Sequence, residues 1–245
     1  MTVLKNKQIT VLDLDFTTLA SQTFSANQNY TIGGYTWTKI NTANETTAAT
    51  LNSNGLTFVP VSATDYVTAT RTLPGLLLPF QQIIPGFRGD MGVRVWAYNS
   101  ANNAAANFDN AVMAVENSAI TYSYGMIRGF TSGGQGSAVR LSVNNALASG
   151  QINDLFTLGT TNNVMVLEIP SITGSHWRSF RGAFAGNNWP RMEELTQHSS
   201  YTLTGTVATT AVTPQSLCVL LGAVRAASGT ALTVRFARLR IDLLL

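Results

Sequence analysis

The sequence predicts an all-β protein, built as a two-sheet antiparallel sandwich or jelly roll. Short runs with the two-residue alternation of half-buried strands recur along its 245 residues. Many runs are rich in Val, Ile, Thr, Tyr and Phe, and turn residues such as Gly, Asn, Ser and Pro separate them. Runs of this number and spacing are typical of β-sandwiches. The expected strands cover 9–16, 35–40, 56–61, 66–73, 91–98, 110–116, 120–127, 138–143, 163–169, 201–207, 216–224 and 232–243.

The chain shows no internal repeat and no linker, so we expect a single β-sandwich domain over residues 1–245. One segment, 190–198, has the pattern of a short helix, with Pro190 at a permitted first-turn position. Cys218 is the single cysteine, so an internal disulfide is excluded. Its apolar neighbours predict a buried, unreactive thiol.

The two ends of the chain carry complementary charges. Near the start, Asp13 and Asp15 alternate with apolar residues, and near the end Arg238 and Arg240 do the same. Opposite charges across a strand ladder stabilise the pair by a few tenths to about 1 kcal/mol, so we expect the first strand to pair with the last. The apolar phase of the last strand shifts by one residue near Ala237, which indicates a β-bulge there.

The chain ends on three leucines. Beyond the bulge, Leu243 and Leu245 are expected to continue the inward face, and Leu244 to face outward beside the arginines. Chain ends usually fray, whereas burying one leucine side chain is worth about 1.5–3 kcal/mol. We therefore expect Leu244 and Leu245 to meet a neighbouring subunit or a supporting shell.

Three stretches carry a resemblance to a known family: LDLDFTTLASQTF (12–24), IGGYTWTKINTANETTAATLNSNGLTF (32–58) and VRFARLRIDLLL (234–245). Together they resemble the concanavalin A-like (LamG-like) jelly-roll sandwich, as found in virion structural proteins of tailed bacteriophages. The resemblance implies that the amino- and carboxy-terminal strands lie together in one sheet. Glycoside hydrolases with this kind of sandwich carry a Glu-x-Asp-x-x-Glu run on one strand, which this sequence lacks.

Charged residues make up 11% of the chain, against about 25% in typical domains. The net charge of +3 arises without a basic block, so we expect no nucleic-acid partner. No run reaches the roughly 20 apolar residues of a membrane helix, and the start lacks a signal-peptide pattern, so we expect no membrane contact and folding in the host cytoplasm. A neutral surface rich in Thr and Asn suits a protein packed in an assembly, and it also suits a lectin.

The sequence offers little catalytic chemistry. The acid pair Asp13/Asp15 is assigned to strand pairing, and Glu193/Glu194 stand at the start of the expected helix. The two histidines lie in no recognisable nucleophile or zinc motif. We therefore predict no enzyme, no catalytic or metal-binding residue and no cofactor. Calcium is kept as an alternative, with oxygen ligands from Asp13, Asp15, Asp90 or Asp109.

Two segments are candidate contact surfaces. The first, 73–87, is apolar and broken by prolines, and it either caps one end of the sandwich or forms an intersubunit contact through Leu77, Phe80 and Ile84. The second, 174–192, is a glycine-punctuated segment rich in Trp, Phe and Arg, which interfaces concentrate, and we interpret it as a recognition loop. Its candidate contact residues are His176, Trp177, Arg178, Phe180, Arg181, Phe184 and Trp189.

The first functional hypothesis is a virion structural protein of a tailed bacteriophage, namely a capsid decoration (cement) or head-fibre protein that acts by protein–protein packing. Its partners would be other copies of itself, as a homotrimer or another symmetric oligomer, and the major capsid protein or another virion protein. The alternative is a carbohydrate-binding tail-fibre or receptor-binding module of lectin type, with a glycan as partner. In both cases the expected location is the virion.

Overall fold

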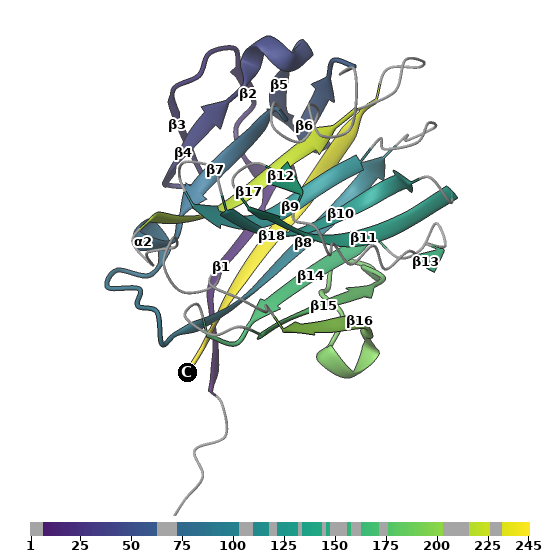
Figure 1. The fold of residues 1–245 in the computed structure, drawn as a ribbon. Helices are drawn as coiled ribbons and strands as arrows, with labels where there is room; N and C mark the ends of the chain where they lie inside the picture. Colours follow the sequence, from purple (N-terminus) through teal and green to yellow (C-terminus); the bar gives the residue numbers. More distant parts are fainter. Residues whose placement is uncertain are drawn as a thin grey trace, which may run out of the picture.

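The computed structural model describes residues 7–62, 73–102, 110–117, 122–131, 134–143, 146–147, 156–157, 163–171, 176–202, 216–225 and 232–245. Nearly all regular structure in these residues is β-strand, and the strands form two antiparallel sheets (Figure 1). This confirms the predicted all-β sandwich of two antiparallel sheets. No helix in this part of the chain is long and apolar enough to span a membrane. A single domain over residues 1–245 stays a prediction.

The two sheets are called sheet A and sheet B. Sheet A runs in the order β16 (Thr196–Thr202), β15 (His176–Gly182), β14 (Val164–Ile169), β8 (Gly92–Asn102), β18 (Val234–Leu244), β6 (Gly55–Pro60), β5 (Glu45–Asn52) and β2 (Gln22–Phe24), and β1 (Gln8–Asp15) also pairs with β18. Sheet B runs in the order β12 (Ala146–Leu147), β11 (Gly134–Val143), β10 (Tyr122–Thr131), β9 (Asn110–Asn117), β17 (Leu217–Val224), β7 (Gly75–Pro79), β4 (Tyr35–Ile40) and β3 (Asn29–Ile32), with β13 (Phe156–Thr157) against β11.

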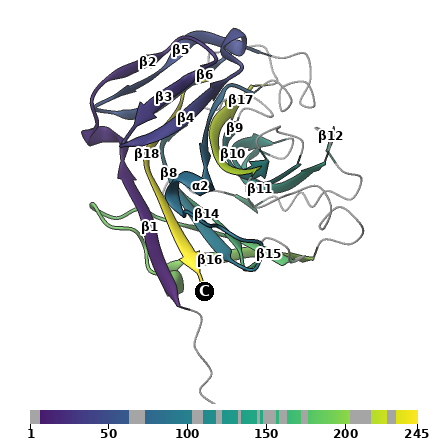
Figure 2. The same cartoon turned by 90° about the vertical axis from the view of Figure 1, so that its left-hand side faces the viewer.

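Strand β18 lies at the centre of sheet A. One of its edges follows β8, and its other edge is shared, because its first part pairs with β6 and its second part with β1. In the ladder with β1, Asp13 lies opposite Arg240 and Asp15 lies opposite Arg238. The predicted pairing of the terminal strands is therefore confirmed, and Figure 2 shows β1 in purple beside β18 in yellow.

The bulge predicted near the middle of the last strand is also present. The register of β18 against β8 shifts between Phe236 and Arg238. Gly55 lies against this bulge with a φ of +109°, and a Cβ at that position would collide with the carbonyl oxygen of Phe236. A glycine is thus required where β6 begins beside the bulge.

The terminal leucines differ in exposure. Leu243 is buried and Leu244 is half-buried, whereas Leu245 is 54% exposed. The expectation that Leu245 continues the buried face is wrong for the single chain. The core ends at Leu243, and Leu245 lies beyond it. The end does not fray, since Leu245 and Lys7 exchange two backbone hydrogen bonds of 3.0 and 3.1 Å.

The core lies between the two sheets, and Cys218 is buried as expected. The segment 73–87 forms strand β7 and the short helix α2 (Phe80–Ile83), and most of its large apolar side chains are buried. Leu77, Phe80 and Ile84 are 3%, 0% and 7% exposed, so a neighbouring chain cannot reach them. The intersubunit contact expected of these three residues is wrong, because their burial inside the chain already removes them from water.

The segment 190–198 is not a helix. The 3-10 turn η3 (Met192–Glu194) is followed at once by β16, which begins at Thr196. Thr196 lies opposite Arg181 of β15. The backbone N–H and C=O groups from Thr196 onward therefore form hydrogen bonds with β15 rather than within a helix. Of the expected strand 66–73, only Leu73 lies within the described residues.

A buried ion pair connects the two sheets. Lys39 of β4 in sheet B and Glu45 of β5 in sheet A are 3.2 Å apart, and neither side chain exposes more than 1% of its surface. Lys39 Nζ also donates to the carbonyl of Ile40 at 2.9 Å. Burial lowers the pKa of Lys39 and raises the pKa of Glu45, and the attraction between the two groups opposes both shifts.

Candidate functional site

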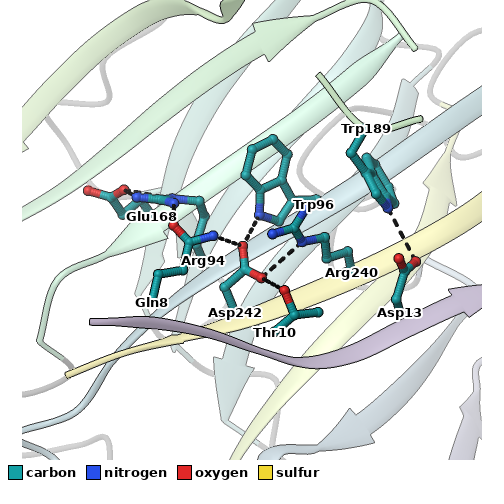
Figure 3. Close-up of polar contacts among 9 residues, drawn as sticks. All are labelled: Gln8, Thr10, Asp13, Arg94, Trp96, Glu168, Trp189, Arg240 and Asp242. Atoms are coloured by element: carbon teal, nitrogen blue, oxygen red, sulfur yellow. Dashed lines mark hydrogen bonds and ion pairs between the residues drawn. The ribbon is translucent and has the colours of Figure 1, made fainter. Parts of the chain in front are cut away.

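The outer face of sheet A carries a connected polar network (Figure 3). Side chains alternate along a strand, so the polar neighbours of the core residues point outward here. The Asp242 carboxylate of β18 is fully buried at the centre of the network. It accepts hydrogen bonds from Gln8 Nε2 at 2.7 Å, Thr10 Oγ1 at 2.8 Å, Trp96 Nε1 at 2.7 Å and Arg240 Nε at 2.9 Å. Four donors therefore replace the water that this carboxylate loses on folding.

Glu168 of β14 is the second buried carboxylate of the network. Arg94 Nε of β8 donates to it at 2.8 Å, and the guanidinium of Arg178 on β15 forms a second ion pair with it. Arg94 also donates to Gln8 Oε1 at 2.6 Å, which joins Glu168 to the group around Asp242. Both buried charges are thus paired with guanidinium groups, as burial of a charge requires.

The loop 183–195 packs on this outer face. Trp189 is held by two contacts, since its ring centroid lies 6.1 Å from that of Trp96 and its Nε1 donates to Asp13 Oδ1 at 3.2 Å. Much of the predicted recognition loop is therefore bound to its own sheet. The contact between the loop and the sheet forms a second apolar cluster, separate from the core between the sheets. Its buried residues are Trp96, Val164, Val166 and Phe180, with Phe184, Trp189, Met192 and Leu195 packed against them.

Part of the loop remains at the surface. Tyr98, Phe184 and Trp189 are half-buried, and the ring of Phe184 stacks on Tyr98 at 4.4 Å and meets Trp189 edge-on at 5.2 Å. The guanidinium of Arg238 lies 5.4 Å from the Phe184 ring centre and donates to the carbonyl of Asn187 at 2.6 Å. We call the following residues the outer-face patch: Asp13, Asp15, Tyr98, Phe184, Trp189 and Arg238.

The structure separates residues that the sequence placed in one recognition loop. Phe180 is 7% exposed, because the alternation of β15 directs it into the second apolar cluster, so its role as a contact residue is wrong. Arg178 is 45% exposed but bound to Glu168. Arg181 is half-buried, and burial lowers the pKa of its guanidinium. Among the five candidates whose side chains are described, Phe184 and Trp189 belong to the outer-face patch.

His176 and Trp177 lie on β15, opposite Thr202 and Tyr201 of β16. Their side chains fall outside the described residues, so their predicted contact role stays a prediction.

Sequence reasoning missed three residues that shape this face: Trp96, Tyr98 and Asp242. A usable signal was present for each, since Trp96 and Tyr98 alternate with apolar residues in MGVRVWAY and Asp242 alternates with Arg240. Alternation alone places them outside the core, but it does not show that the loop 183–195 packs on Trp96 and Tyr98 or that Asp242 is buried.

A pocket of about 460 Å³ lies elsewhere, between the β2 edge of sheet A and the β3 edge of sheet B. This volume falls within the range of roughly 300–1,000 Å³ that small-molecule sites occupy. None of the residues that line it is charged: Leu19, Ala20, Ser21, Gln22, Thr31, Ile32, Gly33 and Leu51.

Across the described ranges, no group of three or more His, Cys, Asp or Glu side chains gathers as metal ligands would. Of the four acids considered for calcium, the three that are described do not converge. Asp13 and Asp15 belong to the outer-face patch, Asp90 pairs with Arg88 at 3.0 Å, and Asp109 lies outside the described residues.

No protein-family model matches this chain, and neither does any curated protein sequence. Among solved structures, a GH43 glycoside hydrolase engineered to display both endo-xylanase and exo-arabinofuranosidase activity is similar with a TM-score of 0.52 and 9% identity, over 90% of this chain and 40% of the enzyme. The lectin from Bauhinia forficata in complex with GalNAc has a TM-score of 0.42 and 8% identity, over 92% of this chain and 98% of the lectin. The CBM2 module of the evolved Dit of Lactobacillus casei BL23 phage J-1 has a TM-score of 0.42 and 11% identity, over 98% of both chains. The first likeness shows a shared fold, and this chain spans 40% of that enzyme's length.

The prediction that the chain is not an enzyme is wrong as it stands, because its fold occurs within a GH43 glycoside hydrolase. The sequence argument considered acids that follow one another on a single strand. A fold also brings carboxylates together from different strands, as it does for Asp242 of β18 and Glu168 of β14, which share one network here.

Proposed function

We propose that this chain is a structural protein of a tailed-bacteriophage virion, of the capsid decoration (cement) or head-fibre kind. It docks through the outer-face patch on the major capsid protein or another virion protein. The observation that carries the proposal is the composition of this patch. Half-buried Phe184 lies against Arg238 and contacts the rings of Tyr98 and Trp189, and binding hot spots at protein interfaces are enriched in Trp, Tyr and Arg.

The patch is held in place before any partner arrives. Phe184 is fixed by stacking on Tyr98, and Trp189 is fixed by its hydrogen bond to Asp13. Ordering a side chain on binding costs about 0.5–1.5 kcal/mol, and these side chains have already lost most of that freedom. A preorganised aromatic surface of this kind supports binding to a partner of fixed shape, such as a capsid lattice.

The composition of the whole chain supports the same role. Charged residues make up 11% of the sequence, so a contact surface buries few ions when it leaves water. The resemblance of the terminal segments to virion structural proteins of tailed phages points in the same direction.

Antibody labelling of purified virions tests the location. Negative-stain images of virions labelled with an antibody to this chain should show label at regular positions on the head. Absence of label from intact virions would contradict the proposal, and label confined to tail fibres would favour the alternative that follows.

A carbohydrate-binding role in a tail fibre is the second candidate, and the uncharged pocket between β2 and β3 favours it. Its lining combines buried Ile32 and Leu51 with exposed Ser21 and Thr31, which suits a neutral saccharide better than an ionic ligand. A glycan array should then show binding that Ser21→Trp, at the exposed rim, abolishes and Phe184→Ala leaves intact. An array without signal for the folded chain would remove this candidate.

A further inference from the structure

Asp13 is the acid of the outer-face patch that forms no ion pair with any described residue. It is exposed, and it lies opposite Arg240 in the ladder between β1 and β18. Arg240 instead donates to the buried Asp242 at 2.9 Å, and Figure 3 shows its guanidinium beside Asp242 and Trp96. A buried carboxylate has lost its water, so it needs the counter-ion more than an exposed one does. Asp242 therefore takes the cation that the strand pairing sets opposite Asp13.

The neighbouring guanidinium groups are also bound to other acids. Arg238 pairs with Asp15 at 3.4 Å. Arg178 shares Glu168 with a second guanidinium, which leaves one positive charge in excess on β15. Four strand spacings separate β15 from β1, about 19 Å at roughly 4.8 Å each, whereas the Debye length is about 8 Å at physiological salt. The excess charge on β15 therefore does not neutralise Asp13.

The unmatched carboxylate lies beside aromatic surface. Trp189 Nε1 donates to Asp13 Oδ1 at 3.2 Å, and Phe184 meets Trp189 edge-on at 5.2 Å. Both rings are half-buried, so part of each remains exposed. Among the described residues, Trp189 is the one hydrogen-bond donor to Asp13, and a carboxylate has about four acceptor positions. The Asp13 carboxylate can therefore accept further hydrogen bonds.

A guanidinium matches these surroundings. Its planar fork binds a carboxylate through two parallel hydrogen bonds, and its plane packs on aromatic rings. The patch already contains a contact of the second kind, because the Arg238 guanidinium lies 5.4 Å from the centre of the Phe184 ring. An ammonium group is a strongly hydrated point charge without this fork, so it matches less well.

We propose that the partner docked on the outer-face patch contributes an arginine side chain, with its guanidinium on the Asp13 carboxylate and against the Trp189 ring. The proposal rests on the proposed docking function and names the chemistry that the partner supplies. An apolar partner side chain at this point would bury the Asp13 charge without a counter-ion, which is costly, and an acidic one would also repel it.

A titration of the isolated full chain tests the guanidinium site without any virion. The probe is N-acetylarginine methylamide, and the readout is the NMR resonance of the Trp189 indole N–H, assigned with Trp189→Phe. This resonance should shift saturably. N-acetylcitrulline methylamide, in which a neutral urea replaces the guanidinium, should bind at least tenfold more weakly. No saturable shift, or equal affinity for the two probes, would overturn the proposal.

A matched pair of variants tests the role of the Asp13 charge. Asp13→Asn keeps an acceptor oxygen for Trp189 and removes the charge, so it should bind the arginine probe at least tenfold more weakly. Asp90→Asn removes the same charge from an exposed acid outside the patch and should bind the probe as the wild type does. Unchanged affinity of Asp13→Asn, or an equal loss in both variants, would overturn the proposal.

Binding to virions that lack this chain separates the arginine contact from the docking function. Asp13→Asn should need at least tenfold more protein than the wild type to occupy the particles, and Asp90→Asn should not. Normal occupancy by Asp13→Asn together with weak occupancy by Phe184→Ala would overturn the arginine contact alone. Normal occupancy by both patch variants would overturn the docking function and the arginine contact together.

Discussion

Asp15 of β1 lies opposite Arg238 of β18, with Asp15 Oδ2 3.4 Å from Arg238 Nε. This pair connects the first strand of the chain to the last. Because Arg238 also lies over the ring of Phe184, the pair connects the terminal strands to the outer-face patch. The geometry of the patch thus depends on the pairing of the two chain ends.

The two partners of this pair should contribute unequally to stability. The ion pair is partly exposed, at 31% for Asp15 and 21% for Arg238, so it is worth less than about 1 kcal/mol by itself. Arg238→Ala should destabilise more than Asp15→Ala, because it also loses the contact with Phe184 and the hydrogen bond to Asn187. Urea unfolding of both variants measures the difference, and equal losses would contradict this account.

The Asp242 carboxylate should be among the most sensitive positions of sheet A. Asp242→Ala leaves Arg240 and three neutral donors without their acceptor, and removing one partner of a buried pair costs about 3–5 kcal/mol. Asp242→Asn should cost less, because one acceptor oxygen remains. The control is Asp90→Ala, which breaks an exposed pair and should change the unfolding midpoint little. A similar small effect for Asp242→Ala would contradict the network.

The buried pair between the sheets should show strong coupling. Lys39→Met or Glu45→Leu alone leaves one buried charge without its partner and should destabilise by about 3–5 kcal/mol. The double variant should recover most of that loss, since no buried charge remains. Additive losses in a double-mutant cycle would show that the two side chains do not interact in solution.

The raised pKa of Glu45 predicts a pH dependence with a definite sign. Between the unfolded-state pKa, near 4.5, and the raised folded-state pKa, the folded protein binds a proton that the unfolded chain has lost. Stability from this group is therefore fully present below the unfolded-state value and is lost as the pH rises through the folded-state value. Relative to Glu45→Gln, the wild type should lose stability across that window, as urea unfolding at several pH values measures. A constant difference, or one that grows with pH, would contradict the direction.

The two tryptophans of the segment 174–192 should now behave differently. Trp189 packs on Trp96 and donates to Asp13, so Trp189→Ala should lower the free energy of unfolding by about 2 kcal/mol, less than the 3–5 of a fully buried aromatic. For Trp177→Ala, the predicted contact role implies weaker assembly or glycan binding with a nearly unchanged Tm. Thermal unfolding of both variants checks these statements. An unchanged Tm for Trp189→Ala would show that the loop is not docked.

The sequence was sufficient for the features that depend on alternation. The two-residue period located β1, β8 and β18, and the complementary Asp and Arg patterns correctly predicted that the terminal strands pair. The phase shift near Ala237 located the bulge, because one extra residue exchanges the faces of a strand.

The features that depend on packing between distant segments could not be predicted from the alternation of the sequence. Phe80 and Trp189 stand in apolar or aromatic segments without a clear period, and only the folded chain decides whether such a segment covers itself or faces outward. The network around Asp242 joins β8 to the paired terminal strands β1 and β18, and no local pattern places β8 beside β18. A short helical pattern such as that of 190–198 is also a weak predictor. Here the second half of the segment pairs with the edge of β15 as strand β16 instead of forming a helix.

The docking role of the outer-face patch is tested most directly by the occupancy of reconstituted virions. Particles that lack this chain are incubated with the wild type, with Phe184→Ala and with Arg191→Ala, whose 73% exposed side chain lies on the same loop outside the patch, and the bound protein is quantified. The wild type and Arg191→Ala should saturate the particles at similar concentrations, while Phe184→Ala should need at least about tenfold more, the equivalent of 1.4 kcal/mol. Equal occupancy by a folded Phe184→Ala protein would contradict the claim that the patch binds the virion.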